Sequence, residues 1–384
     1  MRLDLNVPLK DGVIKDATRI DAVMPTIRYI VKHSGKAILM SHLGRPDGRR
    51  DKAFSLAPVA KAISEKLGKG VALAPDCIGE EAEEEADGLS SGGVLLLENL
   101  RFHSEEEEND ATFAKQLAAL GEVYVNDAFG TAHRAHASTV GVPLLLASQR
   151  KQTAMGFLME QETTTWSKVL SAKVPRYMSI GGGKLNEKLK AISTLGSVFD
   201  CVFVGGVAYN VIRAALGQQV GASIIAEKND DTDYVDISKG LLDKNHNLIL
   251  PSALVIAHSK DGKWADSKTI DSGDDVPDGY AIVDCIFSGE QLAALGSAHA
   301  VVGFGPMGIY EEGFNAGTSA ILDALKGNPG CFVVFGGGDT SALLEDYPNV
   351  TVSTGGGAAI TFLAKGKLEA LEALKGNRGY FKKK

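Results

Sequence analysis

Arginine and histidine side chains concentrate in three short segments of the first 136 residues. The segments are SHLGRP at 41–46, NLRFH at 99–103 and TAHRAH at 131–136. A guanidinium group pairs with carboxylate or phosphate through two parallel hydrogen bonds, so these segments favour binding of a small anion. The whole chain carries a formal charge of −8, which argues against a nucleic-acid surface built on bulk charge. We therefore expect a local anion pocket.

Histidine also ligates metals, and this alternative is open for His133 and His136, which are three residues apart. However, no third ligand stands at matching spacing, and a single histidine is more often a structural residue. A GxSxG motif is absent, which disfavours serine-hydrolase chemistry. The glutamate runs at 80–85 and 105–108 are expected to be solvated, because like charges packed without a cation repel each other.

Glycine clusters indicate a second kind of site. Four expected strands of the second half run into paired or tripled glycines, at 181–183, 205–206, 336–338 and 355–357. Glycine lets the backbone approach a ligand closely, and a following helix N-terminus offers free N–H groups to phosphate. Since parallel sheets bind ligands beyond the carboxyl ends of their strands, the clusters predict a phosphate site of nucleotide size.

Two lysines follow the first glycine cluster. Apolar residues at 185, 189, 192 and 195 predict a helix, with Lys184 and Lys188 on one face of its first turns. A bound anion would offset their unfavourable position at the positive end of the helix dipole, so phosphate contact is expected, with two solvated lysines as the alternative. Asp339, after Gly338, is expected to bind Mg²⁺, to cap a helix, or both.

Two familiar nucleotide loops can be tested against the sequence. GxxxxGK[ST] is absent, so a Walker-type site is not expected. GFGPMG at 303–308 matches GxGxxG, but Pro306 lacks an N–H that a dinucleotide loop would donate, and no clear helix follows. We interpret this match as a coincidence.

Short apolar runs alternate with amphipathic segments throughout, a pattern typical of parallel βαβ units. Helices are expected at 20–31 and 56–67. Strands are expected at 2–6, 37–41, 94–99 and 122–128 in the first half, and at 177–180, 201–204, 247–257, 300–304, 331–335 and 350–354 in the second.

A chain of 384 residues is long enough for two domains. We expect an N-terminal domain at 1–152, a connecting helix without strand character at 153–172 and a C-terminal domain at 173–367, with the tail at about 368–384 returning to the first domain. No apolar run is long enough to span a bilayer, and the N-terminus does not resemble a signal peptide. Four widely spaced cysteines are expected to be reduced, as in the cytoplasm.

Taken together, these motifs resemble the phosphoglycerate kinase family over nearly the whole chain. The most specific part is VNDAFGTAHRAHAST at 125–139. The other matching segments are DLNVP at 4–8, TRI at 18–20, SHLGRP at 41–46, LLLENLRFH at 95–103, GFLME at 156–160, GPMGIYE at 305–311, GGGDT at 336–340 and VSTGGGA at 352–358.

The resemblance implies an α/β fold of two doubly wound, Rossmann-like parallel-sheet domains that face each other across a hinge-closed cleft. It implies reversible phosphoryl transfer between MgATP and the carboxylate of 3-phosphoglycerate, which gives MgADP and 1,3-bisphosphoglycerate. The acid would be bound in the first domain by Asp4, Leu5, Asn6, Arg19, His42, Leu43, Gly44, Arg45, Arg101 and Arg134.

By the same resemblance, the second domain would bind the nucleotide, with Glu311 on the ribose and Asp339 on Mg²⁺. The nucleotide contacts would be Gly182, Gly183, Lys184, Lys188, Gly205, Gly206, Pro306, Glu311, Gly337, Gly338, Asp339 and Thr340. A carboxylate nucleophile is already ionised at pH 7, so catalysis can depend on positioning and on cations without a general base. Arg19 and Lys184 are the expected catalytic cations.

The second half departs from the family pattern. GFGP at 303–306 stands where WNGP is usual, so Phe304 replaces an asparagine that would face the nucleotide, and DCIFS at 284–288 replaces an Asp-x-Gly-Pro turn. Two interpretations of Phe304 stay open: it faces the nucleotide and weakens binding, or its ring points into the core.

Three functions therefore compete. An active, monomeric kinase without nucleic-acid or membrane partners is the main expectation. A binding or regulatory relative with a weakened nucleotide site is the first alternative. A nucleotide-dependent dehydrogenase, which the GxGxxG match would support, is the second.

Overall fold

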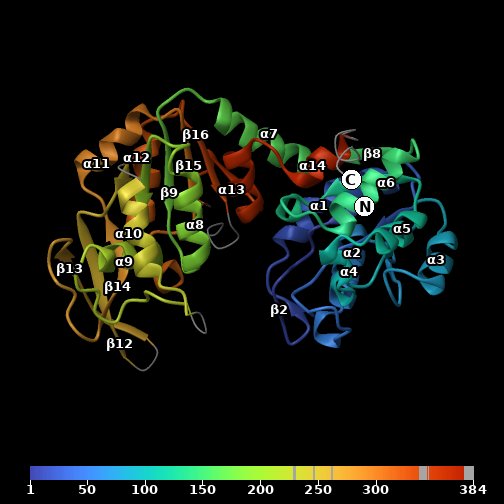
Figure 1. Cartoon of the computed structure of the whole chain (residues 1–384), viewed down its shortest axis with the longest axis horizontal. Helices are drawn as coiled ribbons and strands as arrows, with labels where there is room; N and C mark the ends of the chain where they lie inside the picture. The colour runs from blue at the N-terminus through green and yellow to red at the C-terminus, as the bar shows by residue number, and fades with distance from the viewer. Residues whose placement is uncertain (228–230, 245–246, 261–262, 337–343, 345, 376–384) are drawn as a thin grey trace. The chain divides into compact units, whose positions relative to one another are not determined.

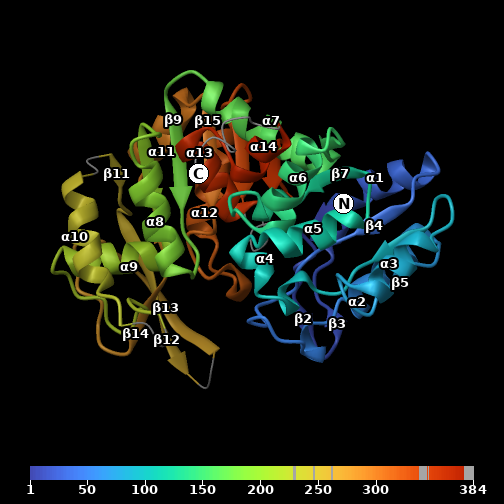
Figure 2. The same ribbon diagram turned by 45° about the vertical axis from the view of Figure 1, so that its right-hand side comes forward.

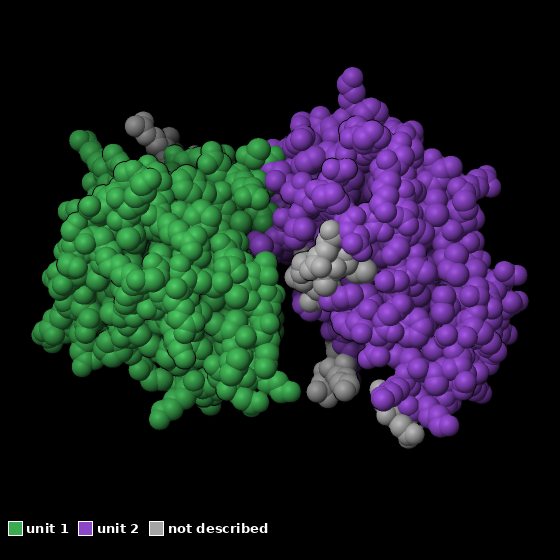
Figure 3. All heavy atoms as spheres, turned by 180° about the vertical axis from the view of Figure 1, so that it is seen from behind, with its two compact units in different colours: residues 1–164, 365–384 green, residues 165–364 purple. Residues whose placement is uncertain are grey.

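The computed structural model describes residues 1–227, 231–244, 247–260, 263–336, 344 and 346–375. The chain forms two compact units, residues 1–164 with 365–384 and residues 165–364 (Figure 3). It passes from the first unit to the second within helix α7 (Phe157–Ser171) and returns at the end of helix α13 (Gly356–Lys365). The domain ranges expected from the sequence stay a prediction.

The first unit contains two three-stranded parallel sheets that are joined side by side. The sheets have the orders β1-β7-β8 and β4-β6-β5, and a parallel bridge between Arg2 and Met40 joins them. Their carboxyl ends therefore lie at one edge. The strands are β1 (Arg2–Leu3), β4 (Ala37–Leu39), β5 (Ala72–Leu73), β6 (Val94–Leu96), β7 (Val123–Asp127) and β8 (Gln152–Met155), beside a hairpin of β2 (Leu9–Lys10) and β3 (Val13–Ile14).

Both faces of β6 are buried. Val94 and Leu96 belong to one hydrophobic cluster, and Leu95 and Leu97 belong to another. Because successive side chains of a strand point to opposite faces, the sheet is covered on both sides, as in a doubly wound fold. The helices are α1 (Thr18–Lys32), α2 (Ala57–Leu67), α3 (Glu80–Asp87), α4 (Glu105–Glu108), α5 (Ala111–Ala119), α6 (Val142–Ser148) and α14 (Glu369–Leu374), with helical turns η1 (Lys52–Phe54), η2 (Leu100–Phe102), η3 (Phe129–Thr131) and η4 (Ala137–Gly141) (Figure 1).

The second unit holds a six-stranded parallel sheet of order β11-β10-β9-β15-β16-β17. Its strands are β9 (Arg176–Ile180), β10 (Cys201–Val204), β11 (Leu248–Ile249), β15 (Ala300–Phe304), β16 (Phe332–Gly336) and β17 (Val350–Ser353). With α13, its helices are α8 (Leu185–Leu195), α9 (Gly206–Ala215), α10 (Tyr234–Lys244), α11 (Gly289–Ala293) and α12 (Ala316–Lys326), with turns η5 (Ala294–Ser297) and η6 (Tyr310–Glu312).

Two expectations about strands were wrong. The run at 247–257 is not one strand, because Pro251 cannot extend a hydrogen-bond ladder and the chain changes sheets there. The second part, β12 (Ala253–Lys260), forms an antiparallel sheet with β13 (Lys263–Asp271) and β14 (Tyr280–Ile286), whose β12–β13 end extends away from the six-stranded sheet in Figure 2. In addition, the segment expected to lack strand character begins in β8. None of the helices in the described part of the chain is long and apolar enough to cross a membrane.

Candidate functional site

The anion-binding candidates of the first unit lie at the carboxyl ends of β1, β4, β6 and β7, where ligands of parallel sheets bind. After β1, Asp4 pairs with Arg19, which is the second residue of α1. Gly130, in the loop after β7, has no room for a Cβ because the Asp4 carboxylate fills that space. The structure thus brings three separate motifs to one point.

Gly44 is held between two other candidates. Its N–H donates to Asn6 Oδ1 at 2.8 Å, and its carbonyl accepts from Arg101 Nη1 at 3.0 Å. The residue has φ +63°, and a Cβ there would overlap the Phe54 ring. Glycine is therefore required for the loop after β4 to reach both neighbours.

His42 is buried and neutral. Burial, and then the charges of Arg2, Arg101, Arg19 and Arg134, hold its pKa well below the ordinary 6.5. Its Nδ1 lies 3.2 Å from a guanidinium nitrogen of Arg2. Since arginine can only donate, Nδ1 accepts and the ring proton is on Nε2, available to donate to a ligand.

Positively charged side chains surround Arg101. Burial lowers the pKa of its side chain, the charges of Arg134 and Arg2 lower it further, and Glu107, at 3.0 Å from Nη2, opposes them. Like charges gathered in a partly buried place repel each other, and a bound polyanion would relieve that repulsion. This electrostatic arrangement is what an anion pocket requires.

Three other candidates are placed differently. The side chains of Leu5 and Leu43 are buried in the hydrophobic core, so they position the backbone and cannot offer polar atoms of their own. Leu43 is fixed by Asn99, which accepts from its N–H at 3.2 Å and donates to its carbonyl at 2.7 Å. Arg45 is exposed directly after Gly44.

Sequence reasoning missed a buried network behind the pocket. Arg2 is 1% exposed and donates to Ser138 Oγ at 2.8 Å, while Ser138 donates to Glu106 through Oγ at 2.6 Å and through N–H at 2.9 Å. Burial raises the pKa of Glu106, and Arg2 opposes that rise. Glu106 is thus an exception to the expectation of a solvated glutamate run. Its partners are distant in sequence, so only the presence of Ser138 in the most specific motif hinted at them.

A pH dependence of stability follows from two histidines of this region. Burial, and then Arg2, Arg101, Arg134 and His133, lower the pKa of His136 to about 3, and the pKa of His42 is also well below 6.5. Both rings stay neutral in the folded protein, so the unfolded chain binds more protons below pH 6.5. The free energy of unfolding must therefore decrease as the pH is lowered through this range. The decrease is about 1 kcal/mol per ring between pH 7 and pH 5.5.

We expect urea midpoints to fall from pH 7 to pH 5.5, and to fall less in a His136→Asn variant. An exposed control, His33→Asn, should keep the wild-type slope. Comparing slopes removes any pH-independent loss of packing. Glu106, whose raised pKa acts in the opposite direction and whose Oε1 lies 3.9 Å from His136 Nδ1, is present in all three proteins. An unchanged slope in His136→Asn would refute the assignment.

In the second unit, three glycine-containing loops converge at the ends of β9, β10 and β15. Gly181 N–H donates to the Phe304 carbonyl at 3.0 Å, and Gly206 N–H donates to the Met307 carbonyl at 2.9 Å. A Cβ on Gly206, which has φ +56°, would lie 2.5 Å from the backbone nitrogen of Gly182. Only glycine lets these backbones approach so closely. Gly205 directly precedes α9 as its N-cap, and Gly183 has open space around it.

The two lysines lie at the start of α8, as expected. Lys184 is the exposed N-cap residue, and Lys188, one turn later, donates from Nζ to the Phe304 carbonyl at 3.1 Å. Lys188 is therefore fixed at the glycine loops. Lys184 is exposed at the helix N-terminus, where the N–H of Asn186 donates to the Glu227 carboxylate at 2.9 Å.

Phe304 points into the core. Its ring is 2% exposed, stacks on Trp166 with centroids 5.9 Å apart and packs against Gly336. The core interpretation is thus correct, and the interpretation that Phe304 faces the nucleotide is wrong. Gly303 leaves the space that the Phe335 ring occupies.

The loop after β15 does not behave as a dinucleotide loop. Only the short turn η6 follows it, and α12 begins at Ala316. Pro306 is buried against Gly181, and Glu311 is exposed in η6. Asp284, which the sequence did not single out, supports this loop: its buried carboxylate accepts from Gly317 N–H at 3.4 Å and fills the space beside Gly308. Gly337, Gly338, Asp339 and Thr340 lie outside the described residues.

A hollow of about 820 Å³ in the first unit, between β5 and α3, is lined by none of the candidate residues. The charged residues that line it are Glu81, Glu84, Glu85 and Lys69, so negative charge predominates. The glutamate carboxylates would repel phosphorylated ligands, so size alone does not mark this hollow as the site.

Comparison with known proteins agrees with this arrangement. The family model for phosphoglycerate kinase matches residues 1–367. A phosphoglycerate kinase of Koribacter versatilis is 40% identical, over 97% of this chain and 95% of its own length. A solved phosphoglycerate kinase structure from Coxiella burnetii is 33% identical with a TM-score of 0.75, over 97% of this chain and 95% of its own. A solved structure from Pyrococcus horikoshii is 32% identical with a TM-score of 0.82, over 98% of this chain and 95% of its own.

Fold and site together define an α/β protein with parallel sheets in both units and with groups suited to phosphorylated ligands at the strand ends. The likeness spans almost the full length of the chain and of its relatives. The chain belongs to the phosphoglycerate kinase family.

Proposed function

We propose that this chain catalyses reversible phosphoryl transfer between MgATP and the carboxylate of 3-phosphoglycerate, which gives MgADP and 1,3-bisphosphoglycerate. The observation that carries the proposal is the cation cluster around His42, formed in a chain of net charge −8. The acid has a carboxylate and a phosphate, and both pair well with arginine.

In the first unit, the proposed roles follow from the contacts. Asp4 orients Arg19, whose side chain is 37% exposed and can reach a ligand. His42 donates through Nε2, and Asn6 and Gly44 shape the loop. Arg45, Arg101 and Arg134 are proposed to bind the phosphate, with Leu5 and Leu43 positioning the backbone between them.

In the second unit, the glycine loops and the N-termini of α8 and α9 are proposed to bind the nucleotide phosphates. Lys188 is fixed beside these loops. Lys184 is proposed to stay in contact with the phosphoryl group while it is transferred. Gly182, Gly183, Gly205, Gly206 and Pro306 would form the loop surface, and Glu311 would bind the ribose. Mg²⁺ is proposed to enter with the nucleotide and to meet Asp339, in a segment 337–340 that is also proposed to contact the phosphates.

The chemistry needs no acid–base pair. The acceptor carboxylate is ionised at neutral pH, so catalysis consists of aligning it with the phosphoryl group and stabilising the charge of the transition state. Arg19 and Lys184 are proposed to supply that stabilisation, since preorganised cations require no reorganisation during transfer.

The two alternative functions receive less support. A dehydrogenase would need a dinucleotide loop that opens a helix, and the loop at 303–308 does not. The binding or regulatory relative was suggested by departures in the second half of the chain, above all by Phe304, and the Phe304 ring lies in the core.

We also propose that the protein acts as a monomer in the cytoplasm. All four cysteines are free thiols, two of them buried, which suits a reducing compartment. Size-exclusion chromatography with light scattering tests the monomer.

A coupled assay tests the function. With MgATP and 3-phosphoglycerate we expect 1,3-bisphosphoglycerate to form, and we expect the KM for 3-phosphoglycerate to rise with salt, because the screening length falls from about 10 Å at 0.1 M to about 3 Å at 1 M. Binding of the acid without turnover would instead favour the regulatory relative, and a KM independent of salt would contradict the cationic pocket.

A further inference from the structure

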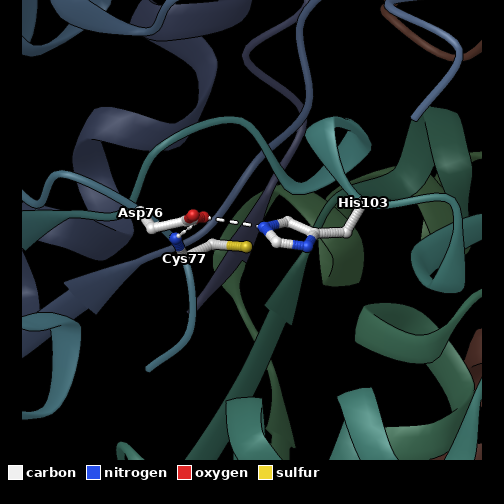
Figure 4. A group of neighbouring side chains, drawn as sticks. All are labelled: Asp76, Cys77 and His103. Atoms are coloured by element: carbon white, nitrogen blue, oxygen red, sulfur yellow. Dashed lines mark hydrogen bonds and ion pairs between the residues drawn. The ribbon is translucent and has the colours of Figure 1, made fainter. Parts of the chain in front are cut away.

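Asp76, Cys77 and His103 form a cluster that the proposed reaction does not use (Figure 4). The first two lie between β5 and α3, and His103 directly follows η2. One potential ligand atom from each residue lies within 4.8 Å of the other two, and His103 Nε2 is 2.8 Å from Asp76 Oδ1. Figure 4 shows the sulfur of Cys77 and the imidazole edge of His103 turned toward each other.

We propose that these three side chains bind one transition-metal ion of the Zn²⁺ type through Asp76 Oδ1, Cys77 Sγ and His103 Nε2. Zinc bonds are about 2.0–2.2 Å to oxygen or nitrogen and about 2.3 Å to sulfur, so tetrahedral ligand atoms lie roughly 3.3–3.8 Å apart. In the structure, His103 Nε2 and Asp76 Oδ1 are hydrogen-bonded at 2.8 Å, closer than that range, and the ligand atoms of the three residues all lie within 4.8 Å of one another. A bound ion would therefore replace the hydrogen bond between His103 and Asp76, and these two side chains would move apart to hold it.

The donor types decide which metal fits. Thiolate and imidazole suit zinc and related transition metals, whereas Mg²⁺ prefers an all-oxygen shell and keeps its waters. The cluster is thus chemically distinct from the Mg²⁺ that accompanies the nucleotide, whose proposed ligand Asp339 belongs to the other unit.

Neighbouring groups already orient the ligands. Asp76 Oδ1 accepts from Cys77 N–H at 2.6 Å and faces His103, while Asp76 Oδ2 accepts from Arg50 at 2.8 Å. The His103 ring packs 5.4 Å from the Phe113 ring. Hydrogen bonds and packing of this kind hold metal ligands in place in known sites.

Charge and access are also compatible with an ion. A divalent ion with one thiolate and one carboxylate is neutral, and the thiol proton would pass to solvent on binding. The Arg50 side chain is 55% exposed, so its charge remains largely in water. Cys77 is fully buried, but the side chains of Asp76 and His103 are 30% and 25% exposed and leave a solvent side for a fourth ligand, a water molecule.

Co²⁺ titration of the full-length, chelator-treated protein tests the proposal, because a cobalt–thiolate bond gives a charge-transfer absorption band. We expect one ion per chain and a band that Zn²⁺ removes and that excess Mg²⁺ leaves unchanged. Cys77→Ser should abolish the band and weaken Zn²⁺ binding by more than about tenfold. The control Cys331→Ser, a half-buried thiol of the other unit, should retain both.

His103→Gln is a second variant in case Cys77→Ser does not fold. It keeps the thiol and an uncharged polar side chain, and it should weaken Zn²⁺ binding by a similar factor. Absence of the band in wild-type protein, or its persistence in Cys77→Ser, would overturn the proposal. The first outcome would leave Arg50, Asp76 and His103 as an ion-pair network without metal.

Discussion

Replacing Arg19 by alanine is expected to lower kcat for phosphoryl transfer by roughly 10²–10³, the usual effect of removing one preorganised donor to transition-state charge. Arg19 sits in the first turn of α1, and Asp4 fixes its guanidinium at the carboxyl end of β1. Its side chain remains 37% exposed, so it is oriented by the protein and still accessible to a ligand.

The same change leaves Asp4 without this partner. Asp4 is 7% exposed, and a buried acceptor that loses its partner destabilises a protein by about 1–3 kcal/mol. We therefore expect a lower thermal midpoint but a folded protein at assay temperature.

Arg28→Ala is the matched control for Arg19→Ala. Arg28 lies on the same helix and makes an exposed hydrogen bond to the Lys66 carbonyl, away from the pocket. Its kcat should equal that of the wild type. Steady-state kinetics and circular dichroism on both variants separate catalysis from folding. If Arg19→Ala reduces kcat less than about threefold, Arg19 is not a catalytic cation.

Much of the fold could be predicted because the parallel strands are short apolar runs that end in recognisable chemistry. The runs at 201–204 and 300–304 match β10 and β15, and glycines or arginine-rich segments follow where the chain turns back. The antiparallel sheet escaped prediction for a physical reason: β13 is largely exposed and polar, so it carries no apolar periodicity.

Some residues of the candidate site could likewise be predicted from the sequence, and others could not. Residues that closely follow a strand, such as Arg101 and Gly181, could be named from sequence, because the topology of a parallel sheet fixes their place. The network of Arg2, Glu106 and Ser138 could not, since its contacts join residues 32 to 136 positions apart. Phe304 was ambiguous because the end of an apolar strand can present a side chain to the core or to the ligand edge.

Replacing Phe304 by asparagine is expected to lower the free energy of unfolding by about 3–5 kcal/mol, the range for removing a buried phenylalanine side chain. The ring stacks on Trp166 and packs against Gly336, so its loss opens a cavity at the carboxyl end of β15. The amide of asparagine would enter an apolar place, which adds a desolvation penalty unless it finds a partner.

Nucleotide affinity should not improve in Phe304→Asn, because it is the backbone of residue 304 that faces the glycine loops. Its carbonyl accepts from Gly181 N–H at 3.0 Å and from Lys188 Nζ at 3.1 Å, while the side chain points away. Urea unfolding measures the stability, and calorimetry with MgADP, at a temperature where the variant is folded, measures the affinity.

Phe304→Leu, which keeps the site apolar, should lose less stability and bind MgADP as the wild type does. A stable Phe304→Asn variant that binds MgADP about tenfold more tightly would show that the side chain faces the nucleotide after all, since tenfold corresponds to about 1.4 kcal/mol and is within reach of one added hydrogen bond to phosphate.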